Sequence, residues 1–157
     1  MIGSGAGRMD EYLCGTFFFD SSTPIVQQFV STEDKSASPK ELAVSLYRRV
    51  RDGWRYDAYR YHTLREHMRA SEIMQRKRGH CLDKAIVLIA CYRAVGLRSR
   101  LHLAKVKNHI AVERIVEKFG SDELAPHGYV EVFLNDKWVA CTPAFNKGLC
   151  DLIGVAV

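Results

Sequence analysis

The stretch that decides the fold is RGHCLDKAIVLIACYRAVG, residues 78–96 of the chain. Most residues from Cys81 to Val95 are apolar, and a helix that is apolar nearly all round is a buried central helix. Gly96 follows, at the position where helices commonly end on a left-handed glycine. A cysteine at a helix N-terminus sits where backbone N–H groups and the helix dipole favour a thiolate. The stretch therefore predicts a core helix with a nucleophile in its first turn.

Helix-start signals precede the core helix. Thr23-Pro24 predicts a short helix, because proline is favoured at the first helical position. Ser38-Pro39-Lys40-Glu41 is a capping box and predicts a longer helix that Gly53 ends. Thr63-Leu64-Arg65-Glu66 repeats the capping-box pattern and predicts another helix. The apolar run over residues 13–19 predicts a strand.

The segments after the core helix read mostly as strands. Residues 97–107 alternate in part and predict a strand, and Asn108 predicts the cap of a further helix. Two runs, 129–134 and 137–142, are joined by Asn135-Asp136, a pair that tolerates positive φ, and they predict a β-hairpin. The element order indicates an α+β domain in which the core helix packs on an antiparallel sheet.

The composition is that of one globular domain. The chain has 157 residues, of which 47% are hydrophobic and 26% charged. We expect residues 1–10 to be a flexible tail or an expression leftover, and residues 11–157 to form a single domain. The apolar ending at residues 153–157 leaves open a continuation past the last residue. We expect a cytoplasmic protein without a membrane span, because no apolar run approaches the ~20 residues that a span needs and no signal peptide is visible.

The cysteines give no sign of a disulfide framework or a metal centre. Their number is odd and no pair has the C-x-x-C spacing of a zinc or redox motif. We therefore expect free thiols, no metal and no cofactor. The cysteines are Cys14, Cys81, Cys91, Cys141 and Cys150.

Positive charge is concentrated in residues 48–78. This stretch has ten Arg or Lys and four Asp or Glu, against a formal net charge of +5 for the whole chain. A solvated helical face is the favoured interpretation. A site for acidic substrates or for nucleic acid is the alternative. Since no nucleic-acid motif is recognisable, we do not expect a nucleic-acid partner. The sequence gives no oligomeric state.

The hairpin supports a geometric prediction about His127. If Asn135-Asp136 is a two-residue turn, Tyr129 faces Thr142 across the ladder. Alternation then places His127 on the same sheet face as Thr142, roughly 5–8 Å away. An imidazole that meets Cys81 can share the proton of the thiol. The residue best placed to orient this ring is then a threonine.

Four segments, taken in order, resemble the transglutaminase-like superfamily of cysteine enzymes with a papain-like core. They are Arg78-Gly79-His80-Cys81-Leu82-Asp83-Lys84-Ala85, residues 92–100, His127-Gly128-Tyr129-Val130-Glu131-Val132 and Trp138-Val139-Ala140-Cys141-Thr142-Pro143. The resemblance covers about residues 40–146. It implies Cys81 as nucleophile and His127 as general base and acid. The family's third residue, an aspartate just before a proline, falls on Thr142.

The resemblance implies acyl transfer on an amide or peptide bond through a thioester. The backbone N–H of Cys81 is the natural oxyanion donor. Trp54 or Tyr56 is a candidate second donor, because transglutaminases use an aromatic residue from the segment before the cysteine. A peptide or protein substrate is expected, with hydrolysis slightly favoured over crosslinking because nothing identifies an amine-acceptor site.

Several questions stay open at the level of sequence. Asn146, Glu131 or Asp151, or a carboxylate past the last residue, could orient the ring of the histidine in place of Thr142. His109 is a rival base, although its place in a predicted helix cap favours a structural role. The alternative function is a catalytically degenerate transglutaminase-like module that binds a peptide or protein.

Overall fold

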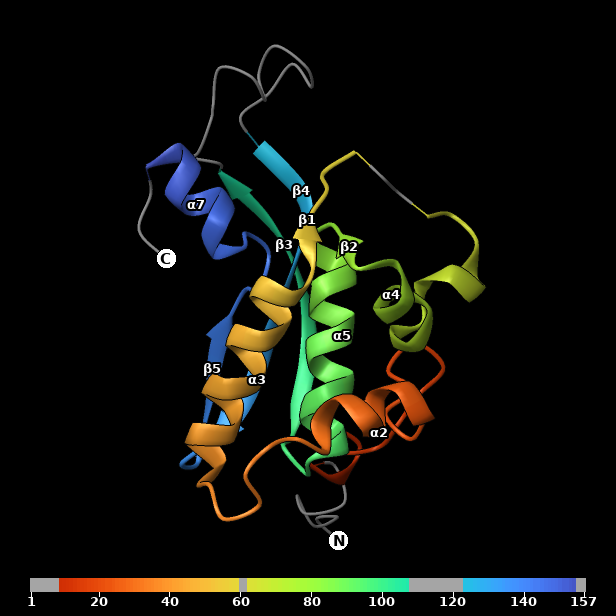
Figure 1. Ribbon diagram of the computed structural model, residues 1–157, viewed down its shortest axis with the longest axis vertical. Helices are drawn as coiled ribbons and strands as arrows, with labels where there is room; N and C mark the ends of the chain where they lie inside the picture. The colour runs from red at the N-terminus through yellow and green to blue at the C-terminus, as the bar shows by residue number, and fades with distance from the viewer. Residues whose placement is uncertain (1–8, 60–61, 108–122, 155–157) are drawn as a thin grey trace, which may run out of the picture.

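The structure is a computed structural model that describes residues 9–59, 62–107 and 123–154. Helices and short strands precede a central helix, and an antiparallel sheet follows it (Figure 1). The elements are α2 (Pro24–Val30), α3 (Pro39–Gly53), β1 (Arg55–Tyr56), the 3-10 helix η1 (Arg65–Met68), α4 (Ala70–Arg76), β2 (Arg78–Gly79), α5 (Cys81–Ala94), β3 (Ser99–Lys107), β4 (Glu123–Leu134), β5 (Lys137–Cys141) and α7 (Lys147–Ile153).

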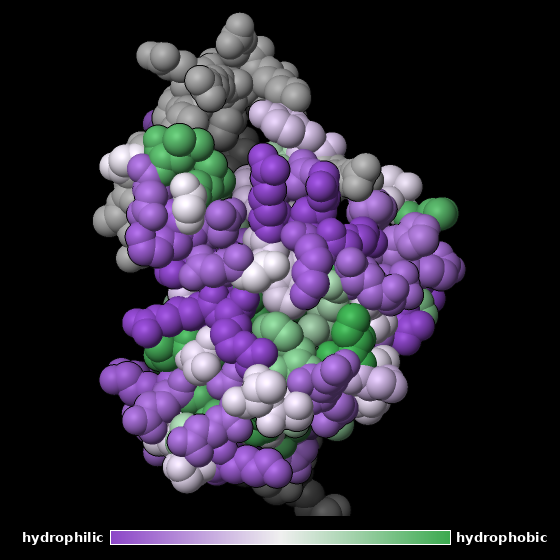
Figure 2. Space-filling view, viewed as in Figure 1, coloured by the Kyte–Doolittle hydropathy of each residue, from purple (hydrophilic) through white to green (hydrophobic). Residues whose placement is uncertain are grey.

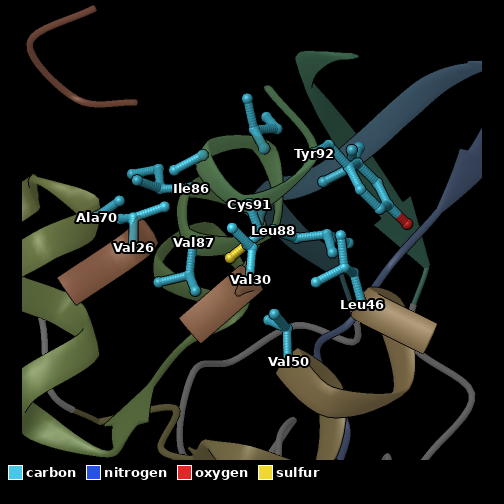
Figure 3. Close-up of a cluster of buried hydrophobic side chains, with 14 of the residues drawn as sticks. Val26, Val30, Leu46, Val50, Ala70, Ile86, Val87, Leu88, Cys91 and Tyr92 are labelled. Atoms are coloured by element: carbon cyan, nitrogen blue, oxygen red, sulfur yellow. The ribbon is translucent and has the colours of Figure 1, made fainter. Parts of the chain in front are cut away.

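Helix α5 is the centre of the core, as its sequence predicts. Residues 83–93 are all buried, and Gly96 after its end has the expected positive φ of 80°. Figure 1 shows α3 and α4 on either side of α5, with the three-stranded sheet behind it. Apolar side chains of α2, α3 and α4 close around the apolar face of α5 (Figure 3). They include Val26, Val30, Leu46, Val50 and Ala70.

The sheet has the order β3-β4-β5 and is antiparallel throughout. The predicted hairpin is confirmed, since Asn135 and Asp136 form its turn with φ of 49° and 59°. Phe133 pairs with Trp138, so the register is the one that a two-residue turn requires. The predicted α+β class, with a central helix packed on an antiparallel sheet, is confirmed.

A second, parallel pairing sets where α5 begins. Strands β1 and β2 pair Arg55 with Arg78 and Tyr56 with Gly79. The backbone N–H of Asp57 also donates to the carbonyl of Gly79 at 3.1 Å. The chain therefore enters α5 from a strand that is fixed to the end of α3 through β1.

Two capping predictions are confirmed and one is wrong. Helix α2 begins at Pro24, and Ser38 and Glu41 form the expected capping box of α3. The helix predicted from Thr63 instead begins at Ala70, after the 3-10 turn η1. A distant carboxylate decides this start, because Asp20 accepts hydrogen bonds from the backbone N–H and the hydroxyl of Ser71.

The strand predicted over residues 13–19 does not form, and these residues make turns and bends. The Phe18 carbonyl makes one isolated hydrogen bond, accepted from the backbone N–H of Ala70. A β-strand needs backbone hydrogen bonds to a neighbouring strand, and none of the described strands lies beside these residues. The helix predicted from Asn108 lies outside the described residues. Among the described helices, none combines the length and the apolar character needed to cross a membrane.

Candidate active site

The nucleophile candidate begins α5, and its neighbours fix that start. The ring Nδ1 of His80 accepts a hydrogen bond from the backbone N–H of Asp83 at 3.1 Å. The Asp83 carboxylate accepts from the backbone N–H of His80 at 3.2 Å, which completes a reciprocal cap. His80 is therefore the N-cap residue, and Cys81 is the first residue of the helix.

Gly79 is required by the same cap. A Cβ added at Gly79 would lie 2.6 Å from the Cβ of Asp83, closer than real Cβ contacts come. The side chain of Asp83 therefore occupies the space that any other residue at position 79 would need. The tripeptide Gly79-His80-Cys81 is in this sense a helix-start motif as well as the carrier of the thiol.

Burial raises the pKa of the Cys81 thiol above its ordinary value, and the nearby Asp83 carboxylate raises it further. Hydrogen bonds from the backbone N–H groups of Gly128, Leu82 and Cys81 act in the opposite direction, but burial is the larger effect. The expectation of a stabilised thiolate is wrong in this respect. The donors are in place, yet the protonated thiol is the resting form at neutral pH.

Strand β4 meets the first turn of α5 at Gly128. A Cβ added there would lie 3.0 Å from the Cα of Leu82 and 3.2 Å from its Cδ1, so the strand and helix backbones are in close contact. The Gly128 backbone is also close enough to Cys81 to lower the pKa of its thiol. Because His127 precedes Gly128 and Cys81 precedes Leu82, this contact brings His127 and Cys81 into one region, although 46 positions separate them in the chain.

The ring of His127 meets Thr142, as the hairpin geometry predicts. The ring Nε2 and the Thr142 hydroxyl oxygen lie 3.2 Å apart. Burial lowers the pKa of His127, so the neutral imidazole is favoured. The Thr142 carbonyl accepts a hydrogen bond from the Tyr47 hydroxyl at 3.1 Å, which ties this end of β5 to α3.

Trp54 is not placed as an oxyanion donor. Its side chain is 1% exposed, and its indole N–H donates to the Ile73 carbonyl at 3.2 Å. Trp54 directly follows α3, and tertiary packing places its side chain in the hydrophobic core. Tyr56, the alternative, lies on β1 beside Gly79, with its ring centroid 4.8 Å from that of Phe145.

The carboxylates and the amide considered as substitutes for the third residue have other contacts. The Asn146 carboxamide oxygen accepts from the backbone N–H of Tyr56 at 3.2 Å. Glu131 lies 2.7 Å from both Arg100 and His102, and Asp151 lies 2.7 Å from the Lys147 ammonium group. Thr142 is therefore the side chain that the described structure places at the far nitrogen of His127. His109 lies outside the described residues.

Two functional positions escape an analysis of the sequence. Gly128 has no local signal, because its importance comes from the approach of Leu82. Lys84 is a charged residue in the first turns of α5 for which solvent exposure is the ordinary expectation, yet it is 0% exposed. A signal was present, since a lysine inside a helix that is apolar all round has no solvent face to occupy.

The described residues contain no group of three or more His, Cys, Asp or Glu side chains that could hold a metal ion. All five cysteines are free. The chemistry that this site offers is therefore that of a thiol, an imidazole and backbone N–H donors.

A comparison with protein families agrees with the site. The model of the transglutaminase-like superfamily matches residues 24–143, which includes Cys81, His127 and Thr142. The chain therefore belongs to the transglutaminase-like superfamily. No curated protein matches its sequence.

Solved structures share the fold at low sequence identity. A "putative cysteine protease" from Cytophaga hutchinsonii is 15% identical, with a TM-score of 0.65 over 87% of this chain and 42% of that one. The periplasmic domain of TgpA from Pseudomonas aeruginosa is 14% identical, with a TM-score of 0.64 over 90% of this chain and 48% of that one. The same domain bound to ethylmercury has a TM-score of 0.60 at 15% identity, over 87% of this chain and 49% of that one. The chain thus spans less than half the length of each of these structures.

Proposed function

We propose that this chain is a cysteine-dependent acyl-transfer enzyme that acts on amide or peptide bonds, with hydrolysis favoured over crosslinking. One observation carries the proposal. Gly128 packs directly on Leu82 at the start of α5, so that Cys81 and His127, the residues that precede these two, lie beside the same contact. Family membership supports the same roles for Cys81 and His127.

The resting protonation states favour general-base catalysis over a preformed ion pair. Both the thiol and the imidazole are neutral, because burial raises the pKa of Cys81 and lowers that of His127. In the proposed reaction His127 takes the thiol proton while the sulfur forms a bond to the substrate carbonyl carbon. The developing oxyanion is stabilised by the backbone N–H at the start of α5.

The remaining steps return the site to its starting state. His127 gives the proton to the leaving nitrogen as the carbon–nitrogen bond breaks, leaving a thioester on Cys81. A water molecule then attacks the thioester carbonyl while His127 accepts a proton from it. The acid is released when the carbon–sulfur bond breaks and the sulfur recovers its proton.

Thr142 limits the rate that we expect for this reaction. Its hydroxyl can accept a hydrogen bond from the Nε2–H of His127, which fixes the ring and leaves Nδ1 to accept the thiol proton. A hydroxyl carries no charge, however, so it does not stabilise the imidazolium that forms transiently. We therefore expect slower turnover than with a carboxylate at this position, by up to about 10⁴-fold on the scale of triad mutants.

Peptides or proteins are the proposed substrates, and nucleic acid is not proposed. Hydrophilic side chains gather over β1, β2 and α4 in Figure 2, but most of the arginines of residues 48–78 have contacts within the chain. Arg49, Arg51 and Arg69 form ion pairs with Glu33, Asp52 and Asp20. A cytoplasmic location belongs to the proposal, with the free cysteines in its favour.

Thiol reactivity tests the proposal without a known substrate. Iodoacetamide labelling of Cys81 is followed by peptide mass spectrometry across pH 5–9, with exposed Cys14 as a reference thiol in the same molecule. If His127 is the base, His127→Ala slows the labelling of Cys81 at pH 7 by about tenfold or more and leaves Cys14 unchanged.

Turnover is then measured on fluorescent casein for hydrolysis and by dansylcadaverine incorporation for crosslinking. We expect casein hydrolysis that Cys81→Ser abolishes. The proposal fails if no turnover is found and the labelling of Cys81 is the same with and without His127.

The second candidate is a degenerate module that binds a peptide or protein. Two observations favour it, namely the uncharged Thr142 beside His127 and the raised pKa of the buried Cys81 thiol. This module would bind peptide equally well after Cys81→Ser and would show no turnover. Equal labelling of Cys81 in the wild type and in His127→Ala would identify it.

A further inference from the structure

The proposed reaction makes no use of one buried lysine in the same helix as the nucleophile. Lys84, three residues after Cys81, is 0% exposed, whereas lysines are almost never fully buried unless they are paired. Lys84 forms no ion pair with any described residue. Its Nζ instead donates to two backbone carbonyls, those of Arg51 and Ala144, each at 2.7 Å.

Placing an amine here is costly. Burial lowers the pKa of Lys84 to about 7, and the Arg51 charge lowers it too, while the Asp52 and Cys150 side chains act in the opposite direction. A neutral amine has two N–H groups, which matches the two carbonyl acceptors. The helix itself needs no amine, because an apolar side chain would fill the same position. The unfavourable burial of Lys84 is therefore best explained by the two segments of the chain that its hydrogen bonds connect.

The first carbonyl belongs to the C-terminal turn of α3. The last four carbonyls of a helix have no partner within it, and Arg51 is the third residue from the end of α3. A donor with positive character near this end is also favoured by the helix dipole. Lys84 therefore joins the first turns of α5 to the end of α3.

The second carbonyl belongs to the loop that carries Thr142. This loop, residues 142–146, connects β5 to α7. It is held at Thr142, Ala144 and Asn146, and the next residue, Lys147 at the start of α7, is held as well. Tyr47 and Asp52, at the ends of this series of contacts, come from α3. Among the side chains that hold this loop, Lys84 is the one that comes from α5, the helix of Cys81. Its acceptor, the carbonyl of Ala144, belongs to a residue that is 1% exposed and lies two residues after Thr142.

We propose that Lys84 is a positioning residue, which ties the 142–146 loop to α5 and α3 and thereby keeps the Thr142 hydroxyl on the Nε2 of His127. The inference rests on the proposed function, in which the orientation of this ring matters. The test measures the pKa and the tautomer ratio of the His127 ring and requires no turnover. A protein without activity on casein therefore still gives a result.

The experiment follows the side-chain nitrogen signals of His127 by NMR over pH 4–8. Thr142→Ala removes the hydroxyl that accepts from Nε2–H, so it lowers the pKa of His127 and changes its tautomer ratio. Lys84→Met, an apolar residue of similar length, should shift both quantities in the same direction. The double variant should shift them no further than the larger single effect, because both act through one hydroxyl.

Lys147→Met is the matched control. It removes the lysine that directly follows the loop, at the first position of α7, and the Nζ of this lysine donates to the exposed Asp151. The His127 signals should therefore remain those of the wild type. Lys84→Gln, which keeps two N–H donors without a charge, is the second variant and should restore part of the wild-type signal. Unchanged His127 signals in Lys84→Met, or fully additive shifts in the double variant, overturn the proposal. Loss of the folded state in both Lys84 variants also overturns it, since Lys84 is then a stability residue.

Discussion

Gly128 packs so closely on Leu82 that even one added methyl group would force β4 and the first turn of α5 to move slightly apart. The distance from an added Cβ on Gly128 to the Cα of Leu82 would be 3.0 Å, and this neighbour is backbone that cannot rotate away. Since His127 precedes Gly128 and Cys81 precedes Leu82, the same contact sets the spacing of the thiol and the imidazole.

Gly128→Ala should therefore damage the site more than the fold. The added methyl pushes β4 away from α5 by a few tenths of an ångström. Since a displacement of about 1 Å at reacting groups costs on the order of 10²-fold in rate, this smaller shift should cost about 10-fold or less. We expect this loss in the His127-dependent labelling of Cys81 at pH 7, with about 1–3 kcal/mol lost in urea unfolding. Gly53→Ala is the control, because a Cβ at Gly53 meets nothing within 4 Å. Equal labelling in both variants would contradict the prediction.

Thr142→Asp should raise activity. Thr142 is exposed, so a carboxylate at this position remains partly solvated while it lies near the Nε2 of His127. The negative charge favours the imidazolium, raises the pKa of His127 and stabilises the charge that forms as Cys81 attacks. Casein hydrolysis should increase by up to about 10⁴-fold. Thr142→Asn, similar in shape but uncharged, should give no such gain, and an equal gain there would show that charge is not the cause.

His127 should make the protein less stable in mild acid. Burial lowers its folded-state pKa below the ordinary 6.5, so the unfolded chain binds a proton first as the pH falls. The stabilisation is complete above pH 6.5 and is lost as the pH falls from 6.5 toward the folded pKa. Urea unfolding of the wild type and His127→Gln at pH 5 and pH 8 checks this. A difference between the two proteins that is independent of pH would contradict it.

Lys84 should have an effect of the same direction at more alkaline pH. Its pKa is about 7 in the folded chain against 10.5 as the ordinary value, so the unfolded chain binds more protons between these limits. The stability of the wild type relative to Lys84→Met should therefore rise from pH 7 to pH 10, by an amount on the order of a few kcal/mol. Lys147→Met, measured beside it, should show no comparable rise. A flat difference for Lys84→Met would mean that the amine stays charged.

Trp54→Phe should leave the site intact. The indole N–H donates to Ile73 in the core, so its loss costs about 1 kcal/mol of stability and leaves the Ile73 carbonyl without that donor. Labelling of Cys81 and casein hydrolysis should remain those of the wild type after correction for folded protein. A loss of hydrolysis of tenfold or more in a well-folded variant would restore Trp54 as an oxyanion donor.

Local sequence signals determined the elements that they fully specify. The apolar run after Cys81 gave α5, the box at Ser38 gave the start of α3, and Asn135-Asp136 gave the hairpin turn. The position of Thr142 beside His127 followed from the same turn, because a two-residue loop fixes the register of every later pair. Where a distant partner decided the outcome, local signals were wrong. The capping box at Thr63 does not start an α-helix, because the hydrogen bond from the Ser71 N–H to Asp20 sets the start of α4 at Ala70.

By itself the sequence therefore determined the helix of the nucleophile, the hairpin of the histidine and the threonine in third place. Periodicity and turn chemistry act over a few residues, so they can be read without the fold. Only the tertiary structure decided that the thiol and the imidazole are both neutral, that Trp54 belongs to the core, and that Lys84 is buried against the loop of Thr142. Burial and hydrogen-bond partners depend on elements far apart in the chain, and no local pattern records them.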